Sequence, residues 1–399
     1  MQEQKENRKW SKFPRTVNLK TAIALILIAV TLTSTISYYV FAATPSFPTV
    51  ISPGSMTDTA TYVIFKDGLT VYAKNGKTGQ IEFTGTPIYT IQAAINALPE
   101  GGKIFIKAGT YIIDNIIRIM KNNITIEGEG CATCLHLQDA MNAPLIVIDA
   151  VTAKKSIEGV TLCNFLVDGN RPKQTSGSHG IYLKGNETYG VFSCVLHDLR
   201  IMYCYFAGIY AEYTSEIHYA NLELGWNYNN LEIHHSSESR IENVVVSCGY
   251  QDGIQIIDSS DICLEANCEF QTRYGILIQD SNFTQINAIL YYNKRDGLKL
   301  DGALRNTIEV ISRANSQDGD GFYDGINLYD SLYNIVSNSQ LFGENSTKRL
   351  RWGLCEEGTS DYNVVISVNA RDNVAWGGIK KIGVNTKVNL CWNGTAWIP

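Results

Sequence analysis

Four side chains that can exchange protons, Glu212, Glu232, His234 and Asp252, fall in three consecutive copies of a short repeated segment. Carboxylates act as general acids or bases, and histidine transfers protons near neutral pH. If each copy is a strand stacked about 4.8 Å from the next, Glu212 and Glu232 are diagonal neighbours about 8 Å apart. Inverting glycosidases hold their two carboxyl groups roughly 6.5–9.5 Å apart. The spacing therefore allows glycosidic bond chemistry, although charged side chains also cover ordinary solvated strands.

The segment that carries these residues recurs every 22 to 28 residues. Its copies are His179–Gly185, Ala207–Tyr213, Asn229–His235, Asp252–Asp258, Tyr274–Asp280, Asp296–Gly302, Asp324–Asp330, Trp352–Gly358 and Trp376–Ile382. Apolar and polar residues alternate within each copy, which predicts a half-buried strand. Further strands are expected at Arg240–Val246, Asp261–Ala266, Phe283–Ile289, Thr307–Ile311 and Tyr362–Val368. No helical period runs through the repeat, so the sequence predicts a parallel β-coil of stacked rungs.

Alternation within the copies predicts two columns of outward-facing side chains on one sheet. The first column holds Tyr182, Tyr210, Glu232, Gln255, Leu277, Lys299 and Asn327, and the second holds Lys184, Glu212, His234, Ile257, Gln279, Asp301 and Tyr329. The turn before the strand adds His179, Asp252, Asp296 and Asp324. We expect Glu212, Glu232, His234 and Asp252 to be catalytic. The residues expected to bind substrate are His179, Tyr182, Lys184, Tyr210, Arg273 and Lys299, with tyrosines stacking on sugar rings and cations meeting uronate carboxylates.

Three segments resemble the pectate-lyase-like, right-handed parallel β-helix superfamily. Thr90–Ile113 (TIQAAINALPEGGKIFIKAGTYII) resembles the cap helix and first rung of that family, and Ile124–Gly128 and Leu166–Arg171 (LVDGNR) are also similar to it. The resemblance covers roughly Thr61 to the C-terminus. It implies an all-β, single-stranded right-handed parallel β-helix with a short N-terminal cap helix. The superfamily contains lyases, hydrolases, epimerases, phage tailspikes and non-enzymes, so the resemblance leaves the reaction open.

The reaction motifs of the family members are incomplete here. Pectate lyases hold Ca²⁺ with aspartates beside an arginine base, and only Asp296, Asp301 and Arg295 come near that pattern. Ser178-His179-Gly180 resembles the His-Gly element of polygalacturonases, without their preceding aspartate elements. Epimerases follow an Asp-Gly-Asn-Arg rung, here Asp168–Arg171, with an Asp-Pro-His-Glu motif that is Tyr210-Ala-Glu-Tyr213 in this chain.

No cofactor is required by the predicted cluster. Ca²⁺ is the one cation considered, at Asp318, Asp320 and Asp324, because carboxylates are its preferred ligands. A turn-rich insertion is the alternative for this stretch. No metal site is predicted elsewhere, since Cys131 and Cys134 form a lone CxxC pair. The ten cysteines are expected to be buried thiols, with disulfides as the alternative.

The N-terminal 61 residues differ in composition from the repeats. Residues 1–20 form a basic tail with a net charge of +4, residues 21–43 carry no charge, and residues 44–61 form a Pro/Ser/Thr linker. A charge-free span of this length crosses a bilayer, and the basic residues on one side place that side in the cytoplasm. We expect a single-pass cell-membrane protein with the β-helix outside, or a secreted one if the segment is a cleaved signal. Residues 62–86 are expected to form a β-hairpin cap, and residues 87–399 the β-helix.

The net charge and the predicted export of the chain indicate which partners it binds. The remaining chain has a net charge of −10, which argues against nucleic acid. Export makes the sequons at Asn186, Asn345 and Asn393 candidate glycosylation sites. The sequence thus predicts a membrane-anchored protein that binds a polysaccharide and cleaves it as a lyase or glycoside hydrolase. The alternative is a non-catalytic glycan-binding, adhesive or envelope protein, and a homotrimer is compatible with either.

Overall fold

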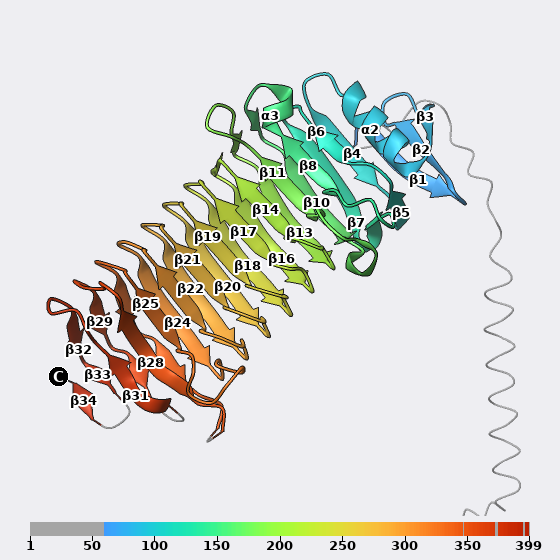
Figure 1. Cartoon of the computed structure of the whole chain (residues 1–399). Coiled ribbons are helices and arrows are strands. Elements are labelled where there is room, and N and C mark those ends of the chain that lie inside the picture. The colour runs from blue at the N-terminus through green and yellow to red at the C-terminus, as the bar shows by residue number, and fades with distance from the viewer. Residues whose placement is uncertain (1–59, 346, 372–373, 394–395, 399) are drawn as a thin grey trace, which may run out of the picture. The chain divides into compact units, whose positions relative to one another are not determined.

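The computed structural model describes residues 60–345, 347–371, 374–393 and 396–398. The predicted tail, membrane-spanning segment and nearly all of the linker lie outside these residues. Within the described part, no helix is long and apolar enough to cross a membrane. The described residues form a continuous coil of stacked rungs (Figure 1).

One face of the coil is a parallel sheet of 11 strands within the described residues. Neighbouring strands come from consecutive rungs, as Figure 1 shows. The strands are β6 (Ile117–Ile119), β8 (Ile146–Asp149), β11 (Ile181–Lys184), β14 (Ile209–Glu212), β17 (Leu231–His234), β19 (Ile254–Ile257), β21 (Ile276–Gln279), β23 (Leu298–Asp301), β25 (Ile326–Tyr329), β28 (Leu350–Glu357) and β31 (Val374–Lys380). This is the sheet that the repeated segments predict, and it is called the front sheet below.

A second, longer sheet forms the opposite wall of the rungs, and its strands in the coil pair in parallel except for the last one, which pairs antiparallel with the strand before it. Its strands in the coil are β7 (Ile124–Leu137), β10 (Thr161–Asp168), β13 (Val195–Met202), β16 (His218–Gly225), β18 (Arg240–Ser247), β20 (Cys263–Glu269), β22 (Gln285–Tyr291), β24 (Thr307–Arg313), β26 (Ile335–Ser337), β27 (Gln340–Phe342), β29 (Val364–Ile366), β30 (Asn369–Ala370), β32 (Lys387–Asn389), β33 (Cys391–Trp392) and β34 (Trp397–Ile398). Between the sheets, β9 (Ile157–Glu158), β12 (Val191–Phe192) and β15 (Thr214–Ser215) begin a narrow seam of paired strands. Each rung therefore has two long sides and one short one.

The seam continues as a corner in which one residue per rung adopts a left-handed backbone. These residues are Ser193, Glu216, Glu238, Asp261, Phe283, Arg305, Tyr333 and Tyr362, with φ between 47° and 60°. Phe283 and Arg305, for example, donate their N–H groups to Leu304 and Leu332 of the next rung. The predicted strands at Asp261, Phe283 and Tyr362 begin two residues too early, because these residues form the corner rather than the strand.

The N-terminal end of the coil is capped. Strands β1 (Tyr62–Asp67), β2 (Thr70–Asn75) and β3 (Ile81–Gly85) form an antiparallel meander, and β1 also pairs in parallel with β4 (Gly102–Ile106). Helix α2 (Pro87–Ala97) follows, and Thr86 caps it by accepting a hydrogen bond from Tyr89 N–H. Buried Ile91 and Ile95 of α2 belong to the same core as the meander, and β5 (Gly109–Ile113) leads into the coil.

The core is a set of stacked aliphatic columns inside the coil. The front sheet contributes Ile181, Ile209, Leu231, Ile254, Ile276, Leu298, Ile326 and Leu354, all of which are buried. Burying one such side chain contributes about 1.5–3 kcal/mol, and each packs against the rungs above and below.

None of the ten cysteines, all of which lie in the described residues, forms a disulfide, and six of them are buried. Two short helices, α3 (Ala150–Ala153) and η1 (Arg171–Lys173), interrupt the early rungs.

Candidate active site

The register of the front sheet places the predicted columns side by side. Backbone pairing of β11, β14, β17 and β19 aligns Tyr182, Tyr210, Glu232 and Gln255 in one column and Lys184, Glu212, His234 and Ile257 in the other. The same register continues through Leu277, Lys299 and Asn327 and through Gln279, Asp301 and Tyr329. Glu212 and His234 are thus direct partners on neighbouring strands, and Glu232 lies two residues before His234.

Glu212 is held by a tyrosine. The Tyr182 phenol donates a hydrogen bond to Glu212 Oε1, and the rings of Tyr182 and Tyr210 meet edge to face at 5.2 Å. Burial and then the hydrogen bond to Glu212 raise the pKa of Tyr182, and burial raises the pKa of Tyr210 to about 12. Both phenols are therefore protonated at neutral pH, and they can donate hydrogen bonds but not act as bases.

Glu232 is held by an amide and faces a histidine. Asn229 Nδ2 donates to Glu232 Oε1 at 2.6 Å, and His234 Nε2 lies 3.4 Å from Glu232 Oε2. The Glu232 side chain is 14% exposed and that of His234 is 20% exposed, so both retain access to solvent. The His234 ring also packs 5.1 Å from the Tyr210 ring. Glu232 and His234 therefore form an adjacent carboxylate–imidazole pair.

His179 lies beside this pair as a neutral stacking group. Burial lowers the pKa of His179 to about 4, so its imidazole is uncharged at neutral pH. Its Nδ1 accepts a hydrogen bond from Ala207 N–H at 3.3 Å, which leaves the proton on Nε2. The ring stacks on Tyr210 at 4.9 Å and on Phe206 at 5.7 Å. His179 therefore extends the aromatic surface rather than supplying charge.

Asp252 and Arg273 are paired with each other. The fully buried Asp252 carboxylate accepts bonds from Arg273 Nε at 2.7 Å and from Arg273 Nη2. Gln255 Nε2 and the Tyr274 N–H complete its shell, at 2.5 Å and 3.0 Å. A carboxylate with every acceptor direction occupied is a structural ion pair, so we leave Asp252 and Arg273 out of the proposed reacting and binding set.

The two predicted lysines lie at different distances from Glu212 and Glu232. Lys184 is the direct strand partner of Glu212, and it also pairs in register with Asp149 of β8. Lys299 lies three strands beyond Glu232, about 14 Å along the coil. Its Nζ lies over the rings of Tyr274 and Tyr329 and 3.5 Å from Asp301. Only Lys184 is therefore adjacent to the cluster, and Lys299 belongs to a separate part of the front sheet.

Comparison with known proteins agrees with this architecture. A family model for the right-handed beta helix region matches residues 229–381. Among solved structures, the A-module of mannuronan C-5 epimerase AlgE6 from Azotobacter vinelandii is similar, with a TM-score of 0.65 and 15% identity, covering 77% of this chain and 95% of that one. Over its described residues the chain is a right-handed parallel β-helix.

Two further solved β-helices are similar at comparable identity. The enzymatically active domain of tailspike protein 2 from bacteriophage CBA120 has a TM-score of 0.57 and 12% identity, covering 76% of this chain and 46% of that one. A mutant of DFA-IIIase from Arthrobacter chlorophenolicus A6, in complex with DFA-III, has a TM-score of 0.54 and 12% identity, covering 69% of this chain and 88% of that one. No curated protein matches the chain. At these identities the likeness establishes the β-helix fold.

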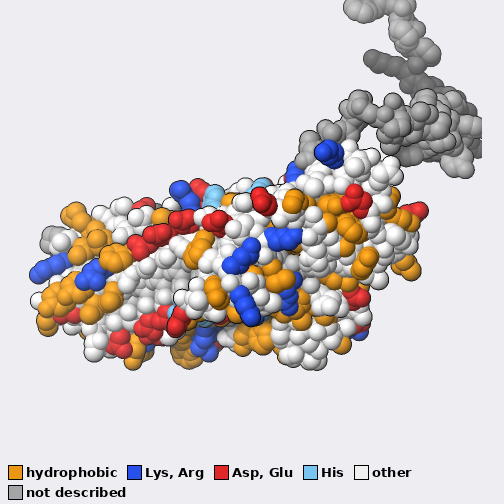
Figure 2. Space-filling view, turned by 90° about the horizontal axis from the view of Figure 1, so that it is seen from above, with side chains coloured by type: hydrophobic (Ala, Val, Ile, Leu, Met, Phe, Trp, Pro, Cys, Tyr) orange, Lys and Arg blue, Asp and Glu red, His pale blue; other side chains and the backbone are white. Residues whose placement is uncertain are grey.

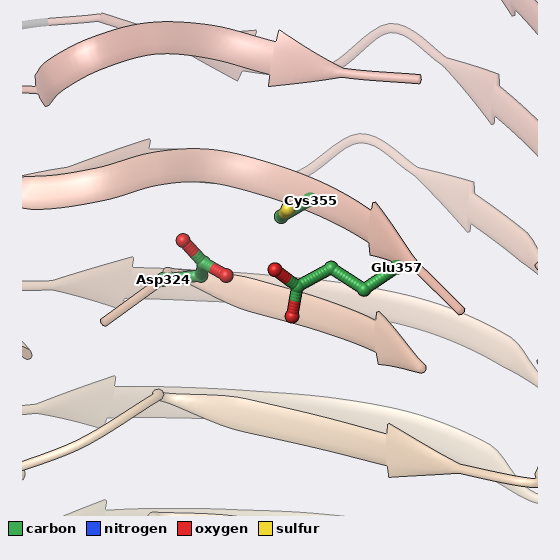
Figure 3. A group of neighbouring side chains, drawn as sticks. All are labelled: Asp324, Cys355 and Glu357. Carbon is green, nitrogen blue, oxygen red and sulfur yellow. The ribbon is translucent and has the colours of Figure 1, made fainter. Parts of the chain in front are cut away.

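A second group of acidic side chains lies further along the β-helix. Ligand atoms of Asp324, Cys355 and Glu357 come within 4.8 Å of one another (Figure 3). Arg351 donates to both oxygens of Asp324, at 3.0 and 2.6 Å, and its Nη2 lies 3.0 Å from Glu357. Burial raises the pKa of the Cys355 thiol, which keeps it protonated. The guanidinium supplies the positive charge that a metal ion would bring, so we interpret this group as an ion-paired network.

The acidic stretch considered for Ca²⁺ is also built around arginines. Asp320 accepts bonds from Arg349 Nε at 3.1 Å and Nη2 at 2.8 Å, and Asp324 is paired with Arg351. Two of the three expected ligands thus have a cationic partner. Calcium binding here stays a prediction, which isothermal titration with CaCl₂ would test.

The three sequons lie in turns near the surface. Asn186 Oδ1 accepts bonds from Thr188 N–H and Tyr189 N–H, which orders its turn, and Asn345 is exposed. Asn393 accepts a bond from Ala396 N–H, and the two residues after it lie outside the described part of the chain. Glycosylation at these positions stays a prediction.

Several residues at the site are absent from the sequence-based prediction. Asn229 binds Glu232, Phe206 stacks on His179, and Tyr228 and Tyr250 follow Phe206 in the next two rungs. The aromatic residues Phe206, Tyr228 and Tyr250 are spaced by 22 residues. This spacing could have identified the three aromatic residues in the sequence, because it equals the length of one rung. The alternation of apolar and polar residues that predicts the strands gives no information about the corners.

Proposed function

We propose that the front sheet binds a polysaccharide across β11, β14 and β17 and hydrolyses it with Glu212 and Glu232. The observation that carries this proposal is the pair of partly exposed carboxylates, each oriented by a neutral donor, beside aromatic side chains. Tyr182 orients Glu212, and Asn229 orients Glu232. Mannuronan is the polymer named for the similar epimerase module, which supports a polysaccharide as the partner of this fold.

The hydrogen bonds suggest how the two carboxyl groups divide the work. The hydrogen bond from the Tyr182 phenol fixes the orientation of the Glu212 carboxylate, which suits a general base that activates water. Glu232 faces His234 at 3.4 Å, so the imidazole can return a proton to it after each turnover. Glu232 then acts as the general acid that protonates the leaving oxygen, as one carboxyl group does in inverting enzymes.

Product analysis of the full-length protein on a panel of neutral and acidic polysaccharides tests the proposal. Hydrolysis releases new reducing ends without absorbance at 235 nm, and proton NMR of the first product shows inversion at the anomeric carbon. Glu212→Gln abolishes release, and Asp301→Asn, on the same column four strands away, serves as the matched control. Release that is unchanged in Glu212→Gln and Glu232→Gln contradicts the assignment.

Eliminative cleavage is the second candidate, and a different observation favours it. His234 lies beside Glu232 and carries an imidazole, a group that serves as a general base, and the protonated phenol of Tyr210 packs next to it. A lyase would release unsaturated ends that absorb at 235 nm. Binding to the polysaccharide with no product of either kind would support the non-catalytic alternative.

We also propose that the β-helix is exported, with residues 21–43 as a membrane anchor. The support is the charge-free span preceded by six Lys and Arg residues. Protease protection of the full-length chain in intact cells tests this arrangement. Digestion of the β-helix by external protease is expected, and complete protection contradicts it.

A further inference from the structure

A ridge of exposed aromatic side chains adjoins the candidate active site. It consists of Phe206, Tyr228 and Tyr250, which are 39%, 37% and 49% exposed. The ridge follows the corner that leads from the second sheet into the front sheet, one residue per rung. Phe206 stacks on His179, and His179 stacks on Tyr210, so the ridge continues directly into the aromatic surface around Glu212.

Arg171 lies on this ridge. Its guanidinium packs over the Tyr250 ring at 3.9 Å, and it also lies 5.3 Å from the Tyr205 ring and 5.9 Å from the Tyr228 ring. Its Nη1 donates to the carbonyls of Cys204 and Tyr205, at 3.1 and 3.0 Å, which fixes the plane of the group. Arg171 is thus held in one orientation across three rungs of the coil.

Arg171 differs from most arginines of the described chain because no carboxylate pairs with it. Ion pairs to acidic side chains hold Arg118, Arg200, Arg240, Arg273, Arg349 and Arg351. An arginine that keeps donors free while stacked on an aromatic ring presents a fork that matches a carboxylate. In a chain whose residues 21–399 carry a net charge of −10, an acidic ligand requires such a local cation.

Figure 2 shows that the charged side chains of one long face are sorted by sign. Acidic groups run in rows along the rod, and several Lys and Arg side chains gather in one region of the same face. The Lys and Arg region can attract an anionic ligand, whereas the acidic rows disfavour one. An anionic ligand therefore needs local cations, and Arg171 is one on the aromatic ridge.

We infer that Arg171, with Tyr228 and Tyr250, forms a subsite for an acidic sugar, a uronate residue, of the bound polysaccharide. The sugar ring stacks on the exposed tyrosine faces, and its carboxylate accepts hydrogen bonds from the free donors of Arg171. The inference rests on the proposed polysaccharide binding and adds the substrate class. It makes Arg171 a residue for specificity rather than for the reaction itself, because the reacting carboxylates lie beyond His179 and Tyr210.

The experiment compares binding of hexauronates with binding of the same hexamers after their carboxyl groups are reduced to alcohols. Hexamers of galacturonate, mannuronate and guluronate serve as probes, and affinity is measured by titration calorimetry on the full-length protein. Wild-type protein is expected to bind at least one hexauronate tighter than its reduced form by tenfold or more. Arg171→Gln is expected to remove that preference and leave affinity for the reduced hexamer within about twofold.

Two further variants separate charge, stacking and folding. Tyr250→Ala leaves the carbonyl contacts of Arg171 in place and is expected to weaken binding of both hexamers by roughly threefold to tenfold. Arg305→Gln is the matched control, since Arg305 also lies on two rings, Phe283 and Tyr333, at the opposite corner. It is expected to bind like wild type. Thermal unfolding of each variant confirms that the coil is intact.

The outcomes distinguish this inference from the proposed function. Tight binding of reduced hexamers with no preference for hexauronates overturns the uronate subsite and leaves polysaccharide binding standing. A preference that survives in Arg171→Gln overturns the role of Arg171 alone. Absence of binding to every hexamer and to the polysaccharide panel overturns both.

Discussion

Two groups of acidic side chains lie on the same front sheet and differ in how their charge is met. Glu212 and Glu232 are half-buried, and neutral donors from Tyr182 and Asn229 orient them. Asp324, further along, is fully buried and receives two bonds from Arg351. Solvent and ligand can reach the first group, whereas the second is paired with a guanidinium inside the protein. A column of acidic side chains therefore does not by itself indicate an active site. What distinguishes the two groups is whether a neutral donor or a guanidinium binds the carboxylate.

Replacement in the first group should have the largest effect. Glu232→Gln preserves the hydrogen bond from Asn229 but removes the proton that the reaction needs, and it should lower polysaccharide turnover by about 10²–10⁴-fold. Its unfolding midpoint should remain near that of wild type. Asp252→Asn should behave in the opposite way, lowering the unfolding midpoint because it leaves the half-buried Arg273 without its counter-charge. Equal losses of turnover and stability in both variants would erase the distinction between the groups.

Removal of the cation in the second group should give the next largest effect. Arg351→Met leaves buried Asp324 without its counter-charge, with only the neutral donors of Asn327 and Trp352 N–H, and breaking one side of a buried ion pair costs about 3–5 kcal/mol. Denaturant unfolding measures the loss. The matched control is Arg349→Met, whose partner Asp320 is on the surface, and only a small change is expected there. Recovery of stability in Arg351→Met with Asp324→Asn would confirm that the unpaired charge is the cause.

The pH dependence of stability offers a finer comparison. Burial and then the charge of Asp324 raise the pKa of Asp296 to about 8, with Lys299 and Arg351 opposing that rise. Between the ordinary pKa of aspartic acid and this raised value, the folded chain binds the extra proton, so stability should fall as pH rises from about 4 to 8. Asp296→Asn keeps the acceptor for Asp324 N–H and should reduce that slope. An unchanged slope would mean that Asp296 is ionised in the folded chain.

The sequence predicted the coil and the two columns because both depend on simple counting. A period of two within the strand and one copy per rung fix which residues align, as the pairing of Tyr182, Tyr210 and Glu232 confirms. The pairing of Asp252 with Arg273 was not predictable in the same way. Arg273 lies in the corner of the next rung, and the path of a corner depends on backbone angles that alternation does not encode. The membrane segment stays a prediction because it lies outside the described residues.

The same limit applies to protonation and to the aromatic ridge. His179 is a titratable group in the sequence, yet its burial lowers its pKa to about 4 and leaves it neutral at neutral pH. In the sequence Arg171 stands out only as part of the Asp168–Arg171 segment, and its lack of an acidic partner emerges only from the packing of four separate rungs. Whether a side chain is charged and available is decided by its neighbours in space.

The left-handed corner has a consequence for how the chain folds. A left-handed residue costs roughly 1–2 kcal/mol, and this cost recurs at Glu216, Glu238, Asp261 and their successors. The compensating hydrogen bond from each corner N–H goes to the following rung, so no turn of the coil is stable until its neighbour is in place. Folding of the coil should therefore begin with a nucleus of several turns and then propagate one rung at a time. A fragment with one or two turns is expected to remain unfolded, while removal of a terminal turn should leave the others intact.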